Sequence, residues 1–403
     1  MQAVKWGFGT ALVHRLLLTA WMALVWGVVG ANLGGVQADF HTAGAQLPAL
    51  QTPAEESIFG VWRRWDAVHY LDLAANGYRV EHPGPTVFGL LTPFSIRAVD
   101  AVLPGSLDLA AAVFETLAFG LALTLVYKVG ETYYGDADLG RWALIVTALL
   151  PLSYFFAAPM SESIYLAMTL GVFYFGARRR WWLAAICGVL ATLARSQGIL
   201  LLPVAALLAL EQHGFSLRDR SRWIRRRFAA PLESWMLAII PLGFVGFVLY
   251  RQSIGLPSLA DVYTNISYNY FTNPVDGLIT NLRWFVEHPE SAFISIDLLS
   301  LALTLILSFV ALRFPRHRRL PLVAYNFGFI LLFASRINYF YGTHDVMFTQ
   351  SFGRYSLALF PLTFLVADGL RSTTPLLRVL GVGALLIGII VLSALYVLAL
   401  SGP

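Results

Sequence analysis

Cysteine and charge are the two scarcest features of this 403-residue sequence. The single cysteine, Cys187, excludes an intrachain disulfide and a cluster of thiolate metal ligands, and it says nothing about the redox compartment. Charged residues make up 13% of the chain and hydrophobic residues 58%, whereas soluble domains carry roughly 25% charge. The composition therefore excludes an ordinary soluble domain and indicates a polytopic membrane protein.

Long apolar runs organise the chain. A membrane helix needs roughly 17 to 25 apolar residues, and about eleven runs meet or approach that length. We therefore expect an all-α polytopic bundle that forms a single integral membrane domain over residues 1–403. The expected spans are Leu12–Leu33, Leu109–Val129, Trp142–Ala158, Ser163–Ala177, Trp181–Ala194, Gly198–Leu210, Trp235–Tyr250, Phe293–Leu312, Leu320–Ala334, Tyr355–Leu370 and Leu376–Leu400.

Two of these runs are short for a full crossing. The runs Trp181–Ala194 and Gly198–Leu210 are separated by the sequence RSQG at residues 195–198, which predicts a pair of broken or re-entrant helices. Helix breaks at membrane depth are tolerated only where protein or water surrounds them. A break at this position would therefore lie inside the bundle or beside an aqueous cavity.

The basic residues predict the orientation. With a cytoplasmic N-terminus, the basic clusters at residues 178–180, 216–228, 313–319 and 371–378 all lie on the cytoplasmic side, as the positive-inside rule requires. The loop 212–234 is then cytoplasmic, and the long loops 34–106 and 253–292 are external. The start of the chain leaves one alternative open, since Lys5 and Arg15 followed by an apolar run resemble a cleavable secretory signal.

The first external loop contains an unusually polar stretch, RRWDAVHYLDLAANGY at residues 63–78. The segment Asp66–Asn76 has no proline or glycine, Asp66 can cap its first turn, and Gly77 can end it, so we expect a short helix. We expect this helix to lie along the membrane surface, with Trp62 and Trp65 as interfacial anchors. One open interpretation limits Asp66 to an N-cap and the neighbouring arginines to contacts with lipid phosphates.

Three further polar residues stand at the external ends of apolar spans. Glu162 follows Pro159 in the sequence PMSES and has an alternative role as part of a helix start with Ser161. Arg195 interrupts two apolar segments, where a charge beside hydrocarbon is costly unless it binds an anion or is paired. Arg354 begins a later span, and snorkelling to lipid headgroups is its alternative role.

These groups together suit one class of reaction. A carboxylate can deprotonate an acceptor hydroxyl while guanidinium groups stabilise a departing phosphate, and a lipid-linked sugar phosphate supplies both the anion and the membrane tether. The histidines and carboxylates lack a recognisable ligand spacing, so we expect no metal site and no cofactor. The candidate groups on this face are Asp66, Asp72, Glu162, Arg63, Arg64, Arg195, Arg354, His69 and His344.

The same motifs resemble a known family. The stretch at residues 63–78 resembles the tryptophan-aspartate loop of the PIG-V family, the GPI mannosyltransferase 2 type with its prokaryotic relatives. The block from PMSES to RSQG resembles that family's serine-glutamate-serine segment and arginine-glycine turn, and FGRYSLALFPL resembles its late arginine-tyrosine span. The RSQG turn and the loop HPGPTVFGLLTPF depart from the usual family pattern, which bears on the acceptor more than on the reaction.

The resemblance implies a GT-C type membrane glycosyltransferase with an extracytoplasmic active site. It implies an inverting transfer of a sugar, expected to be mannose, from a polyprenyl-phosphate donor to a glycolipid or lipid-linked glycan acceptor, with Asp66 as the general base. The membrane would be a prokaryotic plasma membrane or the endoplasmic reticulum, and no nucleic acid is expected as a partner. The expected substrate-binding residues are Arg64, Trp65, His69, Tyr70, Glu162, Arg195, Arg354 and His344.

Two alternatives remain open at this point. A transporter or lipid flippase also uses broken helices with internal charges, although its charges are expected near the bilayer midplane rather than at one face. A catalytically idle scaffold would keep the fold without the reaction. His69, three residues after Asp66, is either an orienting partner of that carboxylate or a solvated residue on the helix face.

Overall fold

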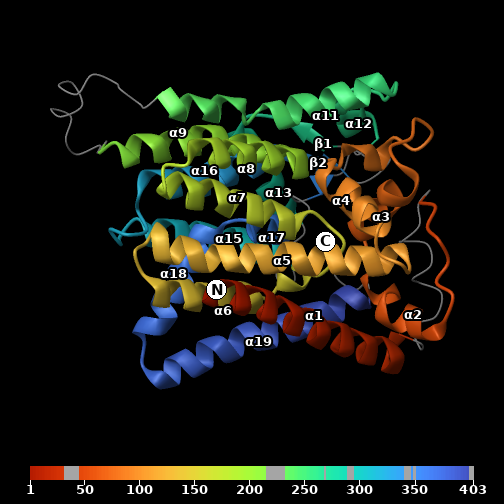
Figure 1. Cartoon of the computed structure of the whole chain (residues 1–403), viewed down its shortest axis with the longest axis horizontal. Coiled ribbons are helices and arrows are strands. Elements are labelled where there is room, and N and C mark those ends of the chain that lie inside the picture. The colour runs from red at the N-terminus through yellow and green to blue at the C-terminus, as the bar shows by residue number, and fades with distance from the viewer. Residues whose placement is uncertain are drawn as a thin grey trace.

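Helices make up most of the structure. The computed structural model describes residues 1–30, 45–214, 232–266, 269–287, 295–339, 346–347 and 351–398. The helical class expected from composition is confirmed over these residues. Figure 1 shows one group of helices running side by side through the bundle, namely α1 (Gln2–Val28), α5 (Leu107–Thr132), α7 (Glu162–Ala177) and α9 (Leu201–Gln212).

Short elements gather at one end of this bundle (Figure 1). They come from three segments that lie far apart in the sequence, and all three reach the same end of the long helices. This end is therefore where we look for a site. Its elements are α2 (Pro53–Ile58), α3 (Asp66–Asn76), α4 (Leu91–Asp100), α12 (Leu259–Asn265), β1 (Asn269–Phe271) and β2 (Arg336–Tyr339).

Apolar helices confirm the integral membrane character. In the part of the chain that the structure describes, four stretches are long and apolar enough to cross a membrane: α1, α5, Glu233–Ser253 and α19 (Pro375–Val397). The third combines η6 (Leu232–Ile239) with α11 (Leu242–Ser253). The shorter apolar stretches are α8 (Trp181–Ala194), Ser196–Gln212, α15 (Ile296–Ala311) and α16 (Leu320–Ala334). The number of about eleven crossings and their orientation stay predictions.

The predicted helix break at residues 195–198 is confirmed. Helix α8 ends at Ala194, Arg195 has an extended backbone (φ −152°, ψ 137°), and η5 (Ser196–Leu200) leads into α9. Gly198 allows this close turn, since a Cβ placed there would lie 2.6 Å from the carbonyl carbon of Ala191. The break turns the chain back on itself and leaves Arg195 on the inside of the turn.

Two other expected spans are interrupted in ways that the hydropathy pattern does not show. The run Trp142–Ala158 forms α6 (Ala137–Leu149) and a separate turn η4 (Ser153–Phe156), with Pro151 between them. The run Tyr355–Leu370 begins in α17 (Phe352–Ser356) and continues in α18 (Phe360–Ser372), which has proline in its first turn. Proline cannot continue a preceding helix but readily starts a new one, which accounts for both interruptions.

The short helix predicted in the first loop is confirmed with its bounds. Helix α3 runs from Asp66 to Asn76 and ends at Gly77, whose φ of 78° favours glycine. The N-cap expected at Asp66 is wrong, because Trp65 occupies that position and no side chain caps the helix. Asp66 is instead the first helical residue, and its carboxylate is available for other contacts.

Helix α3 is largely enclosed by the rest of the protein, and its expected position along the membrane surface stays a prediction. Seven of its eleven residues are buried, including Val68 and Leu71, and it packs against α4 and α5. Trp62, in η2 (Gly60–Trp62), is only 4% exposed and donates its indole N–H to Thr19 Oγ1 at 3.0 Å. Its expected role as an interfacial anchor is therefore wrong, because contacts with α1 enclose it.

Small residues allow the central helices to approach closely. A Cβ added to Gly130 of α5 would lie 2.3 Å from the Cα of Gly140 in α6, so both glycines are needed for this contact. Small residues at helix contacts are the usual means of close packing in membranes, where the lipid offers no hydrophobic driving force between helices. The resulting rigid core supports the ends of α7 and α8, from which site residues project.

A small antiparallel sheet, which was not predicted from the sequence, joins the loop 253–292 to the chain after α16. Strand β2 lies between β1 and β3 (Val346–Met347), with Asn269 opposite Asn338 and Phe271 opposite Arg336. Helix α13 (Pro274–Glu287) packs against β2, and η3 (Gly84–Val87) from the first loop contacts α12. The two loops thus form one assembly at the end of the bundle.

Candidate active site

Four charged side chains from distant parts of the sequence form a continuous chain of ion pairs. Arg354 Nη2 lies 2.7 Å from Asp66 Oδ2, and Arg354 Nε lies 3.0 Å from Glu162 Oε1. Arg195 Nη1 donates to the same Glu162 oxygen at 2.8 Å. Within this cluster the two carboxylates balance the two guanidinium groups.

Helix ends hold two of these charges in favourable positions. Glu162 is the first residue of α7, where the helix dipole stabilises a negative charge. Arg195 directly follows the last residue of α8, where the dipole stabilises a positive charge. The two helix ends thus support the Glu162–Arg195 pair. Ser161 and Glu162 do form the start of α7, as the alternative role had it, but the Ser161 side chain makes no capping hydrogen bond, and Glu162 pairs with arginines instead.

The other two charges follow residues with a left-handed backbone. Trp65, before Asp66, has φ 54° and ψ −137°, and Ser351, just before α17 and Arg354, has φ 68°. Such conformations cost on the order of 1–3 kcal/mol in non-glycine residues and persist only where the surroundings impose them. Strained backbone on both sides of the Asp66–Arg354 pair is consistent with a functional site.

Asp66 is the most accessible of the four charges. Its side chain is 24% exposed, whereas the side chains of Arg354 and Glu162 are 2% and 3% exposed. Burial raises the pKa of Asp66, but the charge and hydrogen bond of Arg354 outweigh burial and hold the pKa below the ordinary value of 3.8. Asp66 is therefore an ionised carboxylate that a ligand can reach.

Aromatic rings fix the guanidinium groups. The ring of Tyr355 lies 4.1 Å from the guanidinium carbon of Arg195 and 4.9 Å from that of Arg354. Such cation–π contacts orient a buried arginine and partly offset the cost of its desolvation. Tyr70 donates its hydroxyl to Ser161 Oγ at 2.8 Å and thereby ties α3 to the start of α7.

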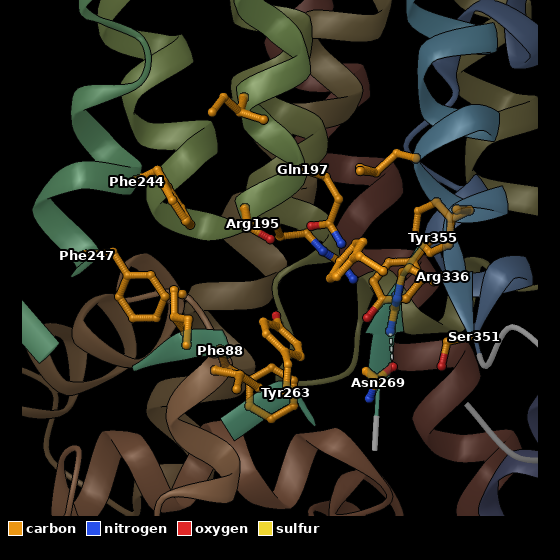
Figure 2. A pocket seen from close by; sticks show the side chains of 18 of the residues that line it. Phe88, Arg195, Gln197, Phe244, Phe247, Tyr263, Asn269, Arg336, Ser351 and Tyr355 are labelled. Atoms are coloured by element: carbon orange, nitrogen blue, oxygen red, sulfur yellow. Dashed lines mark hydrogen bonds between the residues drawn. The ribbon is translucent and has the colours of Figure 1, made fainter. Parts of the chain in front are cut away.

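A cavity of about 710 Å³ opens next to this cluster. Asp66 and Arg195 line it, and Glu162 and Arg354 lie behind them. Figure 2 shows Arg195, Arg336 and Tyr355 close together, with Phe244 and Phe247 of α11 across the cavity. The cavity thus has a charged part beside Asp66 and an apolar part along α11. Apolar lining also comes from Ile199, Leu259, Leu332 and Phe333.

The sequence profile of the mannosyltransferase (PIG-V) family matches residues 42–258 of this chain, which include Asp66, Glu162 and Arg195. The chain belongs to the mannosyltransferase (PIG-V) family. The resemblance noted in the sequence motifs is thereby confirmed. Arg354 and the sheet lie outside the matched range, so the family match does not bear on them; Arg354 was predicted from its own motif, whereas the sheet is seen only in the structure.

Individual relatives agree with the family. GPI mannosyltransferase 2 of Cryptococcus neoformans is 27% identical over 202 residues, or 47% of each chain. GPI alpha-1,6-mannosyltransferase 2 of Cricetulus griseus is 29% identical over 189 residues, or 44% of this chain and 38% of the relative. GPI mannosyltransferase 2 of Schizosaccharomyces pombe is 28% identical over 36% of this chain and 32% of its own. The chain thus spans less than half the length of each of these relatives.

The structure brings most of the predicted substrate-binding residues of this family member together. Tyr70 lines the cavity with Asp66 and Arg195, and His69 stacks at 6.1 Å on Phe88, another lining residue. Arg354 is buried rather than snorkelling to the lipid surface, so that alternative is wrong. Trp65 is half-buried and not part of the cavity wall. His344 lies outside the described residues.

Three other candidate charges pair elsewhere. Arg63 forms an ion pair with Asp108 at 2.6 Å, and Asp72 forms one with Arg79 at 2.8 Å. Arg64 is buried away from the cavity, where its Nε donates to the Val397 carbonyl at 3.2 Å. The dipole of α19 stabilises a positive charge at the C-terminal end of that helix. The contact of Arg64 with Val397 therefore contributes to the stability of the fold. Arg64, predicted to bind substrate, is therefore not among the residues that line this cavity.

Replacement of Arg64 by alanine is expected to lower stability without affecting the use of substrate. The variant loses the bonds to the Val397 and Gly60 carbonyls and the contact 4.8 Å over Trp26. We expect a loss of about 1–3 kcal/mol, measured as a lower melting temperature in detergent, with an unchanged Michaelis constant for the donor. If the variant instead raised the Michaelis constant for the donor and kept the melting temperature, Arg64 would be a substrate-binding residue.

Sequence reasoning missed several residues that shape the site. Arg336 and Asn269 line the cavity from the sheet, and Tyr355 and Tyr263 line it from α17 and α12. Tyr355 adjoins Arg354 in the sequence GRYS, which could have identified it, whereas the sheet residues carry no such signal. Within the described ranges, no group of three histidine, cysteine or acidic residues is placed to hold a metal ion.

Proposed function

We propose that this protein is an inverting membrane mannosyltransferase that uses a polyprenyl-phosphate mannose donor and a glycolipid or lipid-linked glycan acceptor. The observation that carries the proposal is the ionised Asp66 carboxylate, which faces a cavity with a charged part and an apolar part. Membership of the mannosyltransferase (PIG-V) family and the names of its relatives support the sugar and the reaction class. The matched relatives give no support to a transporter or flippase.

In this proposal the apolar part of the cavity holds the isoprenoid tail. Phe244 and Phe247 of α11 and Ile199 of η5 line that part, and the side chain of Ile199 is 41% exposed. An apolar wall beside a membrane helix favours a hydrocarbon chain over a free sugar nucleotide. The donor phosphate would then lie next to Arg195, because that guanidinium lines the boundary between the two parts.

Asp66 acts as the base in the transfer step. An acceptor hydroxyl attacks the anomeric carbon from the face opposite the phosphate, the bond from that carbon to the phosphate oxygen breaks, and Asp66 takes the hydroxyl proton. The configuration at the anomeric carbon is inverted, and the polyprenyl phosphate leaves with the bonding electron pair. A low pKa suits this role, since the carboxylate stays ionised until the attacking oxygen becomes acidic in the transition state.

Arg354 and Glu162 position the base rather than contact the donor. Arg354 holds Asp66 at 2.7 Å, and Glu162 holds Arg354 and Arg195 in fixed orientations. A positioned carboxylate needs less reorganisation on the way to the transition state than a free one. This assignment revises the expectation that Arg354 is a substrate-binding residue.

Transfer of labelled mannose from a polyprenyl-phosphate donor into membrane glycolipid tests the function. We expect the purified protein, reconstituted into vesicles with a mixture of glycolipid acceptors, to produce labelled glycolipid and free polyprenyl phosphate in equal amounts. The anomeric configuration of the product, determined by nuclear magnetic resonance, should be opposite to that of the donor. Transfer from a nucleotide sugar alone, or product with retained configuration, would contradict the proposal.

A further inference from the structure

Arg336 differs from the other arginines of the cavity in that its charge is not balanced. It lines the cavity from β2, and its Nη2 donates to the neutral side chain of Asn269 at 2.8 Å. Among the described residues, no carboxylate forms an ion pair with it, whereas Arg195 and Arg354 both pair with carboxylates. Of these three guanidinium groups, Arg336 is thus the one without an ion-pair partner in the described part of the chain.

The surroundings hold the Arg336 guanidinium beside the other site residues. Its carbon lies 5.5 Å from the ring of Phe333 and 5.9 Å from the ring of Tyr355. Arg195 stacks on the same Tyr355 ring at 4.1 Å, so one tyrosine links the two cavity-lining guanidinium groups. Figure 2 shows Arg336 next to Tyr355 with its bond to Asn269. An anion that meets Arg195 would therefore be within reach of both.

The backbone of Arg336 is fixed as firmly as its side chain. Asn281 of α13, which is only 1% exposed, donates to the Arg336 carbonyl at 2.8 Å. A Cβ on Gly277 would collide with the carbonyl oxygen of Ala334, so glycine is required for α13 to approach the end of α16, two residues before β2. The strand β1 pairs with β2 from the other side. A pre-arranged guanidinium loses little entropy when it binds an anion.

The same face of β2 carries further unused hydrogen-bonding capacity. Asn338 lies two residues after Arg336 and opposite Asn269, so all three residues stand on one face of the sheet. The Asn338 side chain is 1% exposed, and neither its nitrogen nor its oxygen has a hydrogen-bond partner. A buried amide without a partner is costly, which indicates that this face is built for polar contacts.

We propose that Arg336 is a binding residue for the phosphodiester of the lipid-linked donor. A phosphodiester carries a single negative charge, and Arg336 offers it a cavity-lining guanidinium that no carboxylate of the described residues pairs with. Arg336 has five N–H donors, of which Asn269 engages one, so donors remain for two phosphate oxygens at once. The proposal rests on the proposed function for the identity of the donor, and it adds Arg336 of the sheet to Arg195 as a contact of the donor phosphate.

Binding of two probes to the reconstituted full-length protein tests this assignment. The probes are a tail-labelled polyprenyl-phosphate mannose and the corresponding labelled polyprenol, which has the same tail and no phosphate. In the unaltered protein, we expect the phosphate-containing probe to bind more tightly than the polyprenol. In Arg336→Ala, its affinity should fall by about 10-fold or more, while the affinity for polyprenol stays unchanged. Arg336→Lys should regain part of the loss because it keeps the charge.

Arg283→Ala provides the matched control. Arg283 lies exposed on α13, the helix that packs against β2, and it does not line the cavity. Its replacement removes one positive charge from the same region, and we expect both probes to bind as before. Equal loss in both arginine variants would indicate a general effect of charge at the surface and would overturn the assignment.

The outcomes separate this inference from the proposed function. If the unaltered protein binds both probes equally, the phosphate-dependent donor is wrong and both proposals fail. If it prefers the phosphate-containing probe and Arg336→Ala keeps that preference, the assignment of Arg336 alone fails. If Arg336→Ala instead raises only the Michaelis constant for the acceptor, the anion bound there belongs to the acceptor, and the assignment is again overturned. An unchanged melting temperature for Arg336→Ala checks that the variant is folded.

Discussion

Replacing Asp66 by asparagine should nearly abolish sugar transfer while leaving a folded protein that still binds the donor. Asparagine keeps the shape of the side chain but cannot accept a proton, and loss of a general base lowers the rate by roughly 100- to 10,000-fold. The fold should persist because Arg354 keeps its ion pair with Glu162 at 3.0 Å. The measurement is kcat for transfer of labelled mannose, together with the affinity for the labelled donor.

Asp261→Asn is the matched control for this variant. Asp261 is an exposed carboxylate on α12, a helix that contributes lining residues to the cavity, but it does not line the cavity itself. Its replacement removes the same charge from the same region, and we expect kcat to change by less than about 2-fold. Near-normal transfer by Asp66→Asn would show that another group serves as the base.

The pH dependence gives a second readout of the same carboxylate. Asp66 must be ionised to accept a proton, so activity is lost as the pH falls through its pKa, which the structure places below 3.8. In a plot of kcat/KM against pH, the fall in activity on the acidic side should therefore occur at a pH below the ordinary pKa of an aspartate. The variant Arg354→Gln lacks the positive charge beside Asp66, so the pKa of Asp66 should rise. The acidic fall in kcat/KM should then move to higher pH. An identical acidic fall in both proteins would mean that it belongs to another group.

Local features of the site were predictable because they depend on neighbouring residues. The helix from Asp66 to Asn76 follows from the absence of breakers and from the stop at Gly77, and the structure has these bounds. The break at Arg195 follows from a charge that interrupts an apolar run. Both signals lie within about ten residues, the range over which sequence patterns determine helix starts and stops.

Pairing within the site was not predictable from the sequence. Arg354 lies 288 positions from Asp66, and only the packing of the bundle decides that they meet. The sequence left open whether each arginine binds an anion or pairs with a carboxylate, and the structure shows pairing for Arg195 and Arg354. The adjacent residues Arg63 and Arg64 illustrate the same point. Arg63 forms an ion pair with Asp108, whereas Arg64 donates a hydrogen bond to a carbonyl at the end of α19.

Arg336 was missed for a different reason. Its strand pairs with β1 across 67 positions of sequence, and a short polar strand has little periodicity to reveal it. An expectation of helices alone also gave no reason to place residues 269–271 beside residues 336–339. The part of the site that the sheet contributes therefore became visible only in three dimensions.

Replacing Glu162 by glutamine should give the largest loss of stability in the site. Glu162 Oε1 lies 2.8 Å from Arg195 Nη1 and 3.0 Å from Arg354 Nε, and the side chains of both arginines are less than 10% exposed. Removing one partner of a buried ion pair typically costs about 3–5 kcal/mol, because an uncompensated charge stays in a medium of low dielectric. Glutamine keeps the volume, so the loss reports the charge, measured by thermal unfolding in detergent.

A double variant separates the charge effect from packing. In Glu162→Gln with Arg195→Gln, the unpaired guanidinium of Arg195 is also removed, and we expect part of the lost stability to return, as a coupling between the two substitutions. Glu131→Gln is the control, since Glu131 pairs with Lys128 at a site where both side chains are about a third or more exposed, and such pairs contribute little. Additive losses in the double variant would show that Glu162 and Arg195 do not stabilise one another. The link between Glu162 and Arg195 would then not be part of what stabilises the ion-pair chain, and the position of Arg195 beside the cavity would need another cause.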